Sequence, residues 1–244
     1  MSGTALKWIA VISMLVDHTA EVLMNHNEAL TAPVWTQIYG LMRGIGRLAF
    51  PIYAFLLVEG FCHTRNARNY LTRLLVSAAL SEIPFDLAVF HTPFYPGYQN
   101  VFFTLALGLI ALIGIRKTGG LSLYDQIVYG RESGQKTGKC GGWWKQLLIM
   151  AVCSGIAEMI NSDYGGFGVI FIILLSMTRY DKKNQTLLGA VSLVWELPAI
   201  FAFVPIWFYN GTRGRDTGKY FFYAFYPVHL LILWAVGRYL FHLF

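Results

Sequence analysis

Charged residues are scarce in this sequence of 244 residues, where they make up 13% of the chain against 56% for hydrophobic residues. A soluble domain usually carries about 25% charged residues, so this chain has too few to cover the surface of a water-soluble globule. Intrinsic disorder is excluded by the same imbalance, because disordered chains are poor in apolar residues and rich in charge. Together with a mean hydropathy of +0.50, the composition predicts an integral membrane protein.

Cysteine is scarce as well. The three cysteines, Cys62, Cys140 and Cys153, are too few and too odd in number for a disulfide scaffold. No C-x-x-C pair or Cys/His cluster indicates zinc, and we expect no metal. The net charge of +6 does not indicate a nucleic-acid partner, because the basic residues lie between apolar runs and not along one face.

The apolar runs predict an all-α, polytopic fold of about eight transmembrane helices with a polar core, forming a single domain over residues 1–244. The expected spans are 6–24, 38–61, 71–90, 101–115, 144–160, 167–177, 187–208 and 220–243. Lys and Arg gather after the second, fourth and sixth spans, which places the long loop at 117–143 and both termini in the cytoplasm.

One loop does not fit that orientation. Arg213 and Arg215, between the last two spans, would face outward, against the usual preference for basic residues in the cytoplasm. Pro198 and Pro205 lie in the preceding span, so a broken or re-entrant helix there is one explanation. The sequence leaves open on which side this loop lies.

Several ionisable residues lie inside the apolar runs, where a charge costs about 2.5–3.5 kcal/mol on insertion scales. They are Asp17, His18, Glu21, Arg43, Arg47, Glu59, Glu82, Asp86, Glu158, Glu196 and His229. Such residues must face each other or a polar cavity, which predicts a functional site in the interior.

Helical spacing places some of these groups on shared faces. Arg43 and Arg47 are four residues apart, as are Asp17 and Glu21. The two arginines could pair with Asp17, with Glu21, or with the Glu82/Asp86 pair, and the sequence does not choose between them.

His18 is the candidate general base, because an imidazole titrates near neutrality. Asp17 points about 100° away on a helix, so Glu21 is the better placed to orient the imidazole. The alternative is a structural histidine bonded to a carboxylate. His229 is a second candidate, with an interfacial histidine as its alternative.

Two further pairs of residues form candidate contacts at span ends. Glu59 leads into Arg65 at a corner that could face phosphate or could be a simple helix cap. Asn100 opens the fourth span with Thr104 one turn later, and capping alone would explain Asn100.

These motifs together resemble the TraX family of bacterial membrane proteins over nearly the whole chain. The matching stretches are Leu6-Lys7, Met14-Leu15 with Asp17-His18, Gly46-Arg47 through Pro51, Glu59-Gly60-Phe61, His63-Thr64-Arg65-Asn66, Glu82-Ile83-Pro84-Phe85-Asp86, Gln99-Asn100 through Thr104, Asp163-Tyr164-Gly165, Tyr209-Asn210-Gly211 and Phe225-Tyr226-Pro227 with His229. That family is named for a conjugative-pilus protein that N-acetylates the first residue of pilin. It is distantly related to transmembrane acyltransferases in which a buried histidine is catalytic and buried arginines help to hold coenzyme A.

The resemblance implies a multi-pass acetyltransferase of the bacterial plasma membrane, with acetyl-CoA as donor. The acceptor would be an amine or a hydroxyl, such as a peptide N-terminus or an amino sugar, and the transfer could cross the bilayer. His18 matches the catalytic histidine and Arg47 a buried arginine. The candidate residues are Asp17, His18, Glu21 and Arg47 for catalysis; Arg43, Arg47, Arg65, Asn100 and Thr104 for acetyl-CoA; and Glu59, Glu82, Asp86 and His229 for the substrate.

Two alternatives belong to other classes of protein. The acids in the apolar runs would also suit a proton-coupled membrane carrier, although no internal repeat supports a transporter built from two halves. A non-catalytic membrane scaffold for a secretion or pilus system is the other. Unlike the acetyltransferase, a scaffold would keep its function after His18→Ala.

Overall fold

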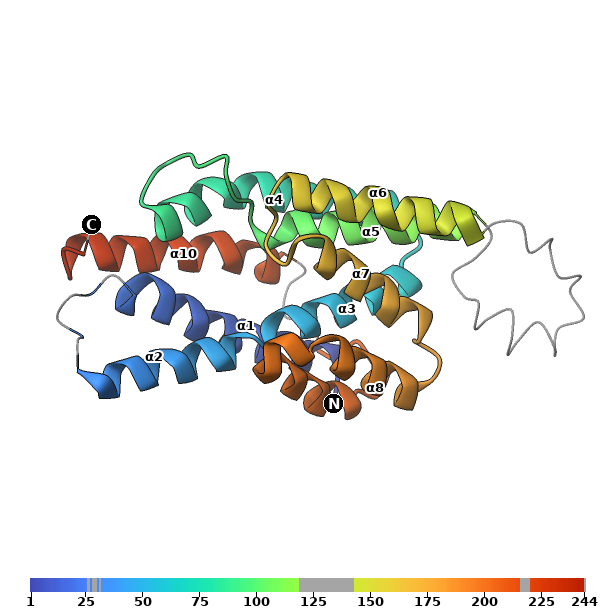
Figure 1. The fold of residues 1–244 in the computed structure, drawn as a ribbon, viewed down its shortest axis with the longest axis horizontal. Coiled ribbons are helices and arrows are strands. Elements are labelled where there is room, and N and C mark those ends of the chain that lie inside the picture. The colour runs from blue at the N-terminus through green and yellow to red at the C-terminus, as the bar shows by residue number, and fades with distance from the viewer. Residues whose placement is uncertain (26, 28–29, 31, 119–142, 216–219, 244) are drawn as a thin grey trace, which may run out of the picture. The chain divides into compact units, whose positions relative to one another are not determined.

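The computed structural model describes residues 1–25, 27, 30, 32–118, 143–215 and 220–243. Every regular element in these ranges is a helix (Figure 1), which confirms the all-α prediction. The expected loop at 117–143 falls almost entirely outside the described residues.

The chain divides into two compact units, each described below by itself. Unit 1 comprises Met1–Leu56, Ala79–Pro96 and Ala190–Phe244, and unit 2 comprises Leu57–Ala78 and Gly97–Gly189. The single domain over 1–244 stays a prediction.

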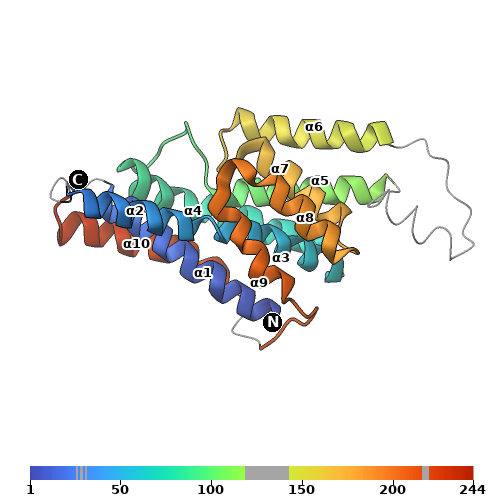
Figure 2. The ribbon, with the colours of Figure 1, turned by 60° about the horizontal axis from the view of Figure 1, so that its bottom comes forward.

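Unit 1 is built mainly from helices near the two ends of the chain. Its elements are α1 (Gly3–Thr19), the π-helical turn η1 (Ala20–Met24), α2 (Pro33–Gly46), the first part of α3 (Ala49–His63), the last part of α4 (Ala67–Phe90), the 3-10 helix η3 (Val194–Ala202), α9 (Phe203–Trp207) and α10 (Phe221–Tyr239). Both α2 and α10 pack against α1 (Figure 2). On α1, Leu6 and Ala10 are fully buried in the interior of unit 1.

Unit 2 is a bundle around three mutually packed helices. These are α5 (Val101–Lys117), α6 (Trp143–Met159) and α7 (Gly165–Met177), joined by parts of α3, α4 and α8 (Lys182–Ser192). Leu109, Leu112 and Ile172 are fully buried in its core. At Gly108 the α5 backbone approaches the Ile172 side chain so closely that a Cβ there would overlap it, so glycine sets the spacing of α5 and α7.

The expected second span is two helices and not one. α2 ends at Gly46, and α3 begins at Ala49 after a turn at Arg47 and Leu48. Pro51 explains the position of the break, since it has no N–H to donate to the carbonyl of residue 47 and its ring clashes with that carbonyl. The break therefore lies one turn before the proline itself.

The expected seventh span is also broken, as its prolines predict. α8 ends at Ser192, and η3 contains a non-helical residue, Glu196, with φ −129° and ψ 66°. Pro198 lies inside η3 and Pro205 inside the short α9. The break turns the Glu196 carboxylate into a position that a continuous helix would not give it.

The count of eight spans is not confirmed. Among the described residues, two helical stretches are long and apolar enough to cross a bilayer, namely Pro33–His63 and Phe221–Tyr239. α1, α5 and α6 have 17 residues each. At 1.5 Å per residue such a helix is about 25 Å long, slightly short of the hydrocarbon core of about 30 Å.

The N-terminus is bonded to the loop that carries Arg213 and Arg215. The Met1 amine donates to the Phe208 carbonyl at 2.6 Å, and the Gly3 and Thr4 amides donate to the carbonyls of Thr212 and Arg213 at 2.8 and 2.9 Å. These bonds satisfy amide donors at the start of α1 that have no partner within the helix. The loop whose side the sequence left open thus lies at the same end of unit 1 as Met1.

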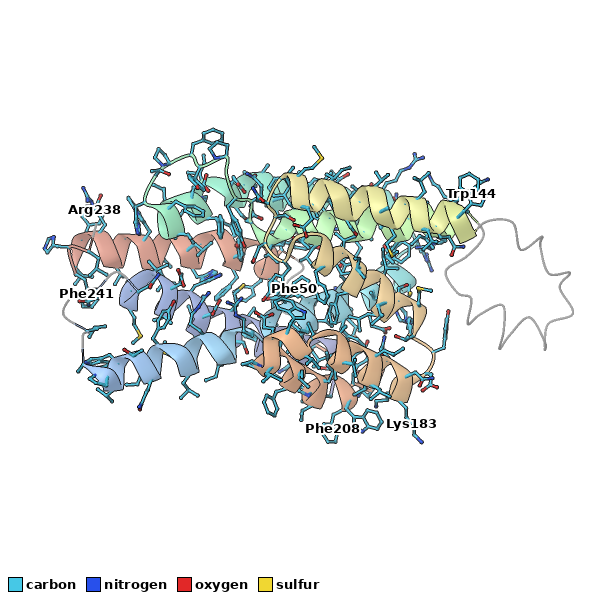
Figure 3. All side chains as sticks on the ribbon, viewed as in Figure 1. Phe50, Trp144, Lys183, Phe208, Arg238 and Phe241 are labelled. Atoms are coloured by element: carbon cyan, nitrogen blue, oxygen red, sulfur yellow. The ribbon has the colours of Figure 1, made fainter. Side chains whose placement is uncertain are left out.

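α1 and α10 run in the same direction. Trp8, early in α1, contacts Phe221 at the start of α10 with ring centroids 5.4 Å apart, and His18, late in α1, contacts His229 further along α10. Figure 3 shows Phe208, next to the N-terminus, and Arg238 with Phe241 at opposite ends of unit 1. This arrangement does not support the prediction that both termini lie on one face.

Candidate active site

The candidate base, His18, lies one residue before the end of α1 and close to the π-helical turn η1. Ser2 fixes the start of this helix, because its hydroxyl accepts from the Ala5 amide at 3.3 Å. In η1 the Asn25 amide bonds to the carbonyl of Ala20, five residues earlier. Single π-helical turns inside helices occur frequently at functional sites.

His18 is paired with His229 from α10. The two imidazoles approach to 2.6 Å between His18 Nδ1 and His229 Nε2, and their rings are stacked with centroids 4.9 Å apart. The other nitrogen of His229, Nδ1, lies 2.8 Å from the Phe225 carbonyl oxygen. His229 is only 4% exposed, whereas His18 is half-buried. His18 is therefore less enclosed than its partner.

The expectation that Glu21 orients His18 is wrong for this structure. Glu21 Oε1 accepts from the Asn25 amide group and Oε2 from the Tyr39 hydroxyl, each at 3.1 Å. Its Oε2 also lies 3.3 Å from Arg43. Within the described residues, neither imidazole has a carboxylate at ion-pair distance.

Arg43 joins two carboxylates next to the histidine pair. Its Nη1 lies 2.9 Å from Asp17 Oδ1 and 3.3 Å from Glu21 Oε2. Asp17 and Glu21 are therefore on one face of the helix, as their spacing predicts, and one guanidinium neutralises both in part. Of the pairings that the sequence left open, the structure selects Asp17 and Glu21 for Arg43.

Arg47 pairs with a carboxylate that the sequence did not offer as its partner. Its Nε lies 3.0 Å from Glu196 Oε1, at the break in η3. Both partners owe their positions to prolines, since Pro51 breaks the helix at Arg47 and Pro198 follows Glu196. Arg43 and Arg47, expected to hold acetyl-CoA, thus both have protein carboxylates as partners.

Gly46 brings α2 against α1 beside this cluster. A Cβ at Gly46 would overlap Cβ, Cγ and Oδ1 of Asp17. The close approach allows Arg43, one turn earlier, to reach both carboxylates. Glycine is therefore required here by space.

The Glu82/Asp86 pair, expected at the substrate, lies on α4. Asp86 is fully buried, and its Oδ2 accepts from the Tyr95 amide at 2.7 Å. The Tyr95 ring also stacks on Phe90 at 4.1 Å, so Asp86 holds the turn that follows α4. Glu82 is half-buried on the same helix. A substrate role for these two residues stays a prediction.

Asn100 and Thr104, expected to contact acetyl-CoA, are fully buried in unit 2. The Asn100 side chain caps α5 by accepting from the Phe102 amide at 3.0 Å and donates to the Ala78 carbonyl at 2.9 Å. The Thr104 hydroxyl bonds to the Asp163 carbonyl and lies 3.0 Å from the Ser162 hydroxyl. These bonds favour the structural interpretation, and the cap predicted for Asn100 is confirmed.

Glu59 and Arg65 lie at the end of unit 2 where α3 finishes. Glu59 Oε1 accepts from Arg179 Nε at 2.6 Å, so its charge is already paired. The Arg116 guanidinium stacks on Phe61, 3.7 Å from the ring centroid. These contacts join the ends of α3, α5 and α7. The exposed basic residues around them, which we call the basic end of unit 2, are Arg65, Arg68, Lys117, Lys145, Lys182 and Lys183.

The residues of unit 1 can support proton transfer at a site where carboxylates and guanidiniums are paired with one another. It offers a half-buried histidine, a second histidine that is buried, and three carboxylates paired with two guanidiniums. No group of three or more His, Cys, Asp or Glu among the described residues could hold a metal ion. Sequence reasoning missed the pairing of His18 with His229, because 211 residues separate them. It noted Glu196 as a buried charge but gave it no partner.

A family model and a known protein each match nearly the whole length of this chain. The family model described as TraX protein matches residues 2–237. A protein of Dichelobacter nodosus described as "Probable fimbrial assembly protein FimC, serogroup H1" is 32% identical over an alignment of 268 residues, which covers 98% of this chain and 97% of that relative. No solved structure gives a significant match.

Proposed function

This chain belongs to the TraX family, and we propose that it is a membrane-embedded, acetyl-CoA-dependent acetyltransferase that acts on an amine or hydroxyl acceptor. The observation that carries the proposal is the half-buried His18, held by a second histidine beside paired charges in an otherwise apolar bundle. Buried ionisable groups in such a bundle are expensive, and they mark functional sites by default.

We place the protein in the bacterial plasma membrane with several spans. Two helical stretches have the length and composition of membrane spans. The basic end of unit 2 fits the cytoplasmic preference of Lys and Arg. In unit 1, Arg213 and Arg215 lie with Met1, so the same rule makes that end cytoplasmic.

The parallel course of α1 and α10 predicts opposite sides for the two termini. We expect a fluorescent protein fused at the N-terminus to mature in the cytoplasm and alkaline phosphatase fused at the C-terminus to be active outside. The reciprocal fusions serve as controls and should be inactive. If both ends report the cytoplasm, α10 does not cross the membrane in the direction proposed here.

In the proposed reaction His18 acts as general base. It removes a proton from the acceptor amine or hydroxyl, whose lone pair attacks the thioester carbonyl of acetyl-CoA. The C–S bond then breaks, the acetyl group stays on the acceptor, and the coenzyme A thiolate takes the proton from His18. General-base catalysis typically contributes about 10²–10⁴ in rate. A route through an acetylated His18 is the alternative, and parallel lines in double-reciprocal plots would favour it.

Acetyl-CoA would bind at the basic end of unit 2. The coenzyme carries several phosphate charges, and Arg is well suited to bind phosphate. Arg65, Arg68 and Lys145 are exposed there, and none of them has a carboxylate partner among the described contacts. Arg43 is assigned instead to holding Asp17 and Glu21 beside His18, and Arg47 to holding Glu196.

The relative's description as a fimbrial assembly protein suggests the first acceptor to test. We propose the N-terminal amine of a fimbrial subunit, and amino sugars as the second class. A non-catalytic role in assembly would fit the same description, so the assay must separate the two.

The test is release of coenzyme A from acetyl-CoA by protein in nanodiscs, with a pool of short peptides and amino sugars as acceptors. We expect acceptor-dependent release by the wild type and a decrease of at least about 100-fold in His18→Gln. His242→Gln is the matched control, because His242 is exposed and outside the site. Mass spectrometry of the pool would identify the acetylated product.

Two outcomes would contradict the proposal. Absence of both coenzyme A release and acetyl-CoA binding would favour the scaffold or carrier. Release that is equal in the wild type and in His18→Gln would show that another group is the base. A His18-dependent release without acceptor would indicate slow hydrolysis, with the true acceptor missing from the pool.

A further inference from the structure

We propose that His229 is the positioning residue of this site: it holds the proton of His18 on Nδ1 and leaves the lone pair of His18 Nε2 for the acceptor. The effect of His229 on catalysis rests on the proposed function, whereas the hydrogen-bond pattern rests only on the geometry of unit 1.

The Phe225 carbonyl, at the end of the chain of hydrogen bonds from His18 through His229, decides which group donates in each bond. The Phe225 carbonyl can only accept, so His229 Nδ1, 2.8 Å away, must carry a proton. A neutral His229 then has a lone pair on Nε2. His18 Nδ1 lies 2.6 Å from that lone pair, so His18 Nδ1 must be the donor. The remaining nitrogen of His18, Nε2, is left without a proton.

His18 and His229 are both uncharged before the reaction, because they are enclosed in the protein. His229 is 4% exposed, and its ring meets the backbone of Phe225 and Tyr226 and the other imidazole. The carboxylates nearest in sequence to His18 are engaged by Arg43. A cation on His229 would therefore be buried without a counter-charge, which is costly.

The ring of His229 is also held in place by its neighbours. Phe225 stacks on it with centroids 4.7 Å apart, and Tyr226 presents an edge at 5.8 Å. Tyr226 meets the His18 ring in the same edge-on way at 5.8 Å. These aromatic contacts restrict both rings to the orientation in which the two nitrogens meet.

This arrangement gives His229 a defined part in the proton transfer. When His18 Nε2 takes the proton of the acceptor, the imidazolium still donates from Nδ1 to His229 Nε2. That bond becomes charge-assisted and stronger. The Nε2 proton then leaves to the thiolate, and His18 returns to its starting tautomer with His229 unchanged.

Two substitutions separate the halves of the hydrogen-bond chain. In His229→Gln, the amide oxygen replaces Nε2 and can still accept from His18. In His229→Asn, the amide nitrogen replaces Nδ1 and can still donate to Phe225, but His18 loses its acceptor. We expect His229→Asn to lower kcat by about 10–100-fold with little change in KM. His229→Gln should keep most of the activity, although both variants lose the same aromatic ring.

A second measurement reports the tautomer without acetyl transfer. In nanodisc samples with ¹⁵N-labelled histidine, the spectrum shows which ring nitrogen of His18 carries the proton, with His18→Gln to assign the signals. We expect the Nδ1–H form in the wild type and in His229→Gln, and a change toward Nε2–H in His229→Asn.

The outcomes separate the two proposals. An Nε2–H tautomer of His18 in the wild type, or equal kcat in His229→Asn and wild type, would overturn the positioning role even if His18 is essential. The expected tautomer pattern in a protein that releases no coenzyme A would support the hydrogen-bond chain and overturn the acetyltransferase.

Discussion

Replacing Gly46 by alanine is expected to remove most of the folded protein from the membrane, with a loss of about 3 kcal/mol in the free energy of unfolding. A single methyl group has this effect because a Cβ at Gly46 would overlap Asp17. The atoms it meets include Asp17 Cβ, which is fixed to the α1 backbone and cannot rotate away. Relief requires α1 and α2 to separate, which lengthens the contact between Asp17 and Arg43. Thermal unfolding in detergent and the yield of monodisperse protein would measure the loss.

Gly40→Ala is the matched control on the same helix. A Cβ there has no neighbour within 4 Å. Alanine favours a helix over glycine by about 1 kcal/mol, so this variant should be as stable as the wild type or slightly more so. Equal stability of the two alanine variants would show that α1 and α2 are not packed as closely as described.

Replacing Arg43 by leucine should destabilise the protein by about 2–4 kcal/mol. Asp17 and Glu21 would then face each other on one helix with no cation between them. The side chains of this cluster are 16–24% exposed, which places the expected loss below that of a fully buried pair. Unfolding in detergent, followed by fluorescence or by loss of helical signal, measures the change. Lys183→Leu, which removes an exposed cation, should have almost no effect on stability.

A combined variant tests whether the loss of stability comes from the unpaired carboxylates. Combining Arg43→Leu with Asp17→Asn and Glu21→Gln removes the repulsion as well as the cation. We expect the combined variant to recover most of the lost stability, because the damage comes from unpaired carboxylates and not from missing volume. A combined variant as unstable as Arg43→Leu alone would mean that the arginine acts through packing.

The sequence predicted the helices well where a local rule decides the outcome. Pro198 and Pro205 indicated a broken span, because a proline acts on the carbonyl one turn before it. Asn100 indicated its cap because the cap lies within two residues. The number of membrane spans could not be settled in this way. Several helices have lengths near the limit for crossing, and small changes at their ends decide the count.

The sequence singled out the residues of this charged cluster but not how they pair. Helical spacing put Asp17 and Glu21 on one face, and the structure places them there with Arg43. Spacing also suggested Glu21 as the partner of His18, although Glu21 serves Arg43, Tyr39 and Asn25. The true partner, His229, lies on the last helix. Contacts between distant helices depend on packing, which no local pattern records.

The bonds between the N-terminus and residues 208–215 have a consequence for how the chain is made. The ribosome produces α1 more than 200 residues before the acceptors for its Met1, Gly3 and Thr4 donors. Unit 2 contains none of these late residues and can be completed while synthesis continues. α1 would thus wait for these contacts while all of unit 2 is synthesised, and it must be kept from misassembly during that time.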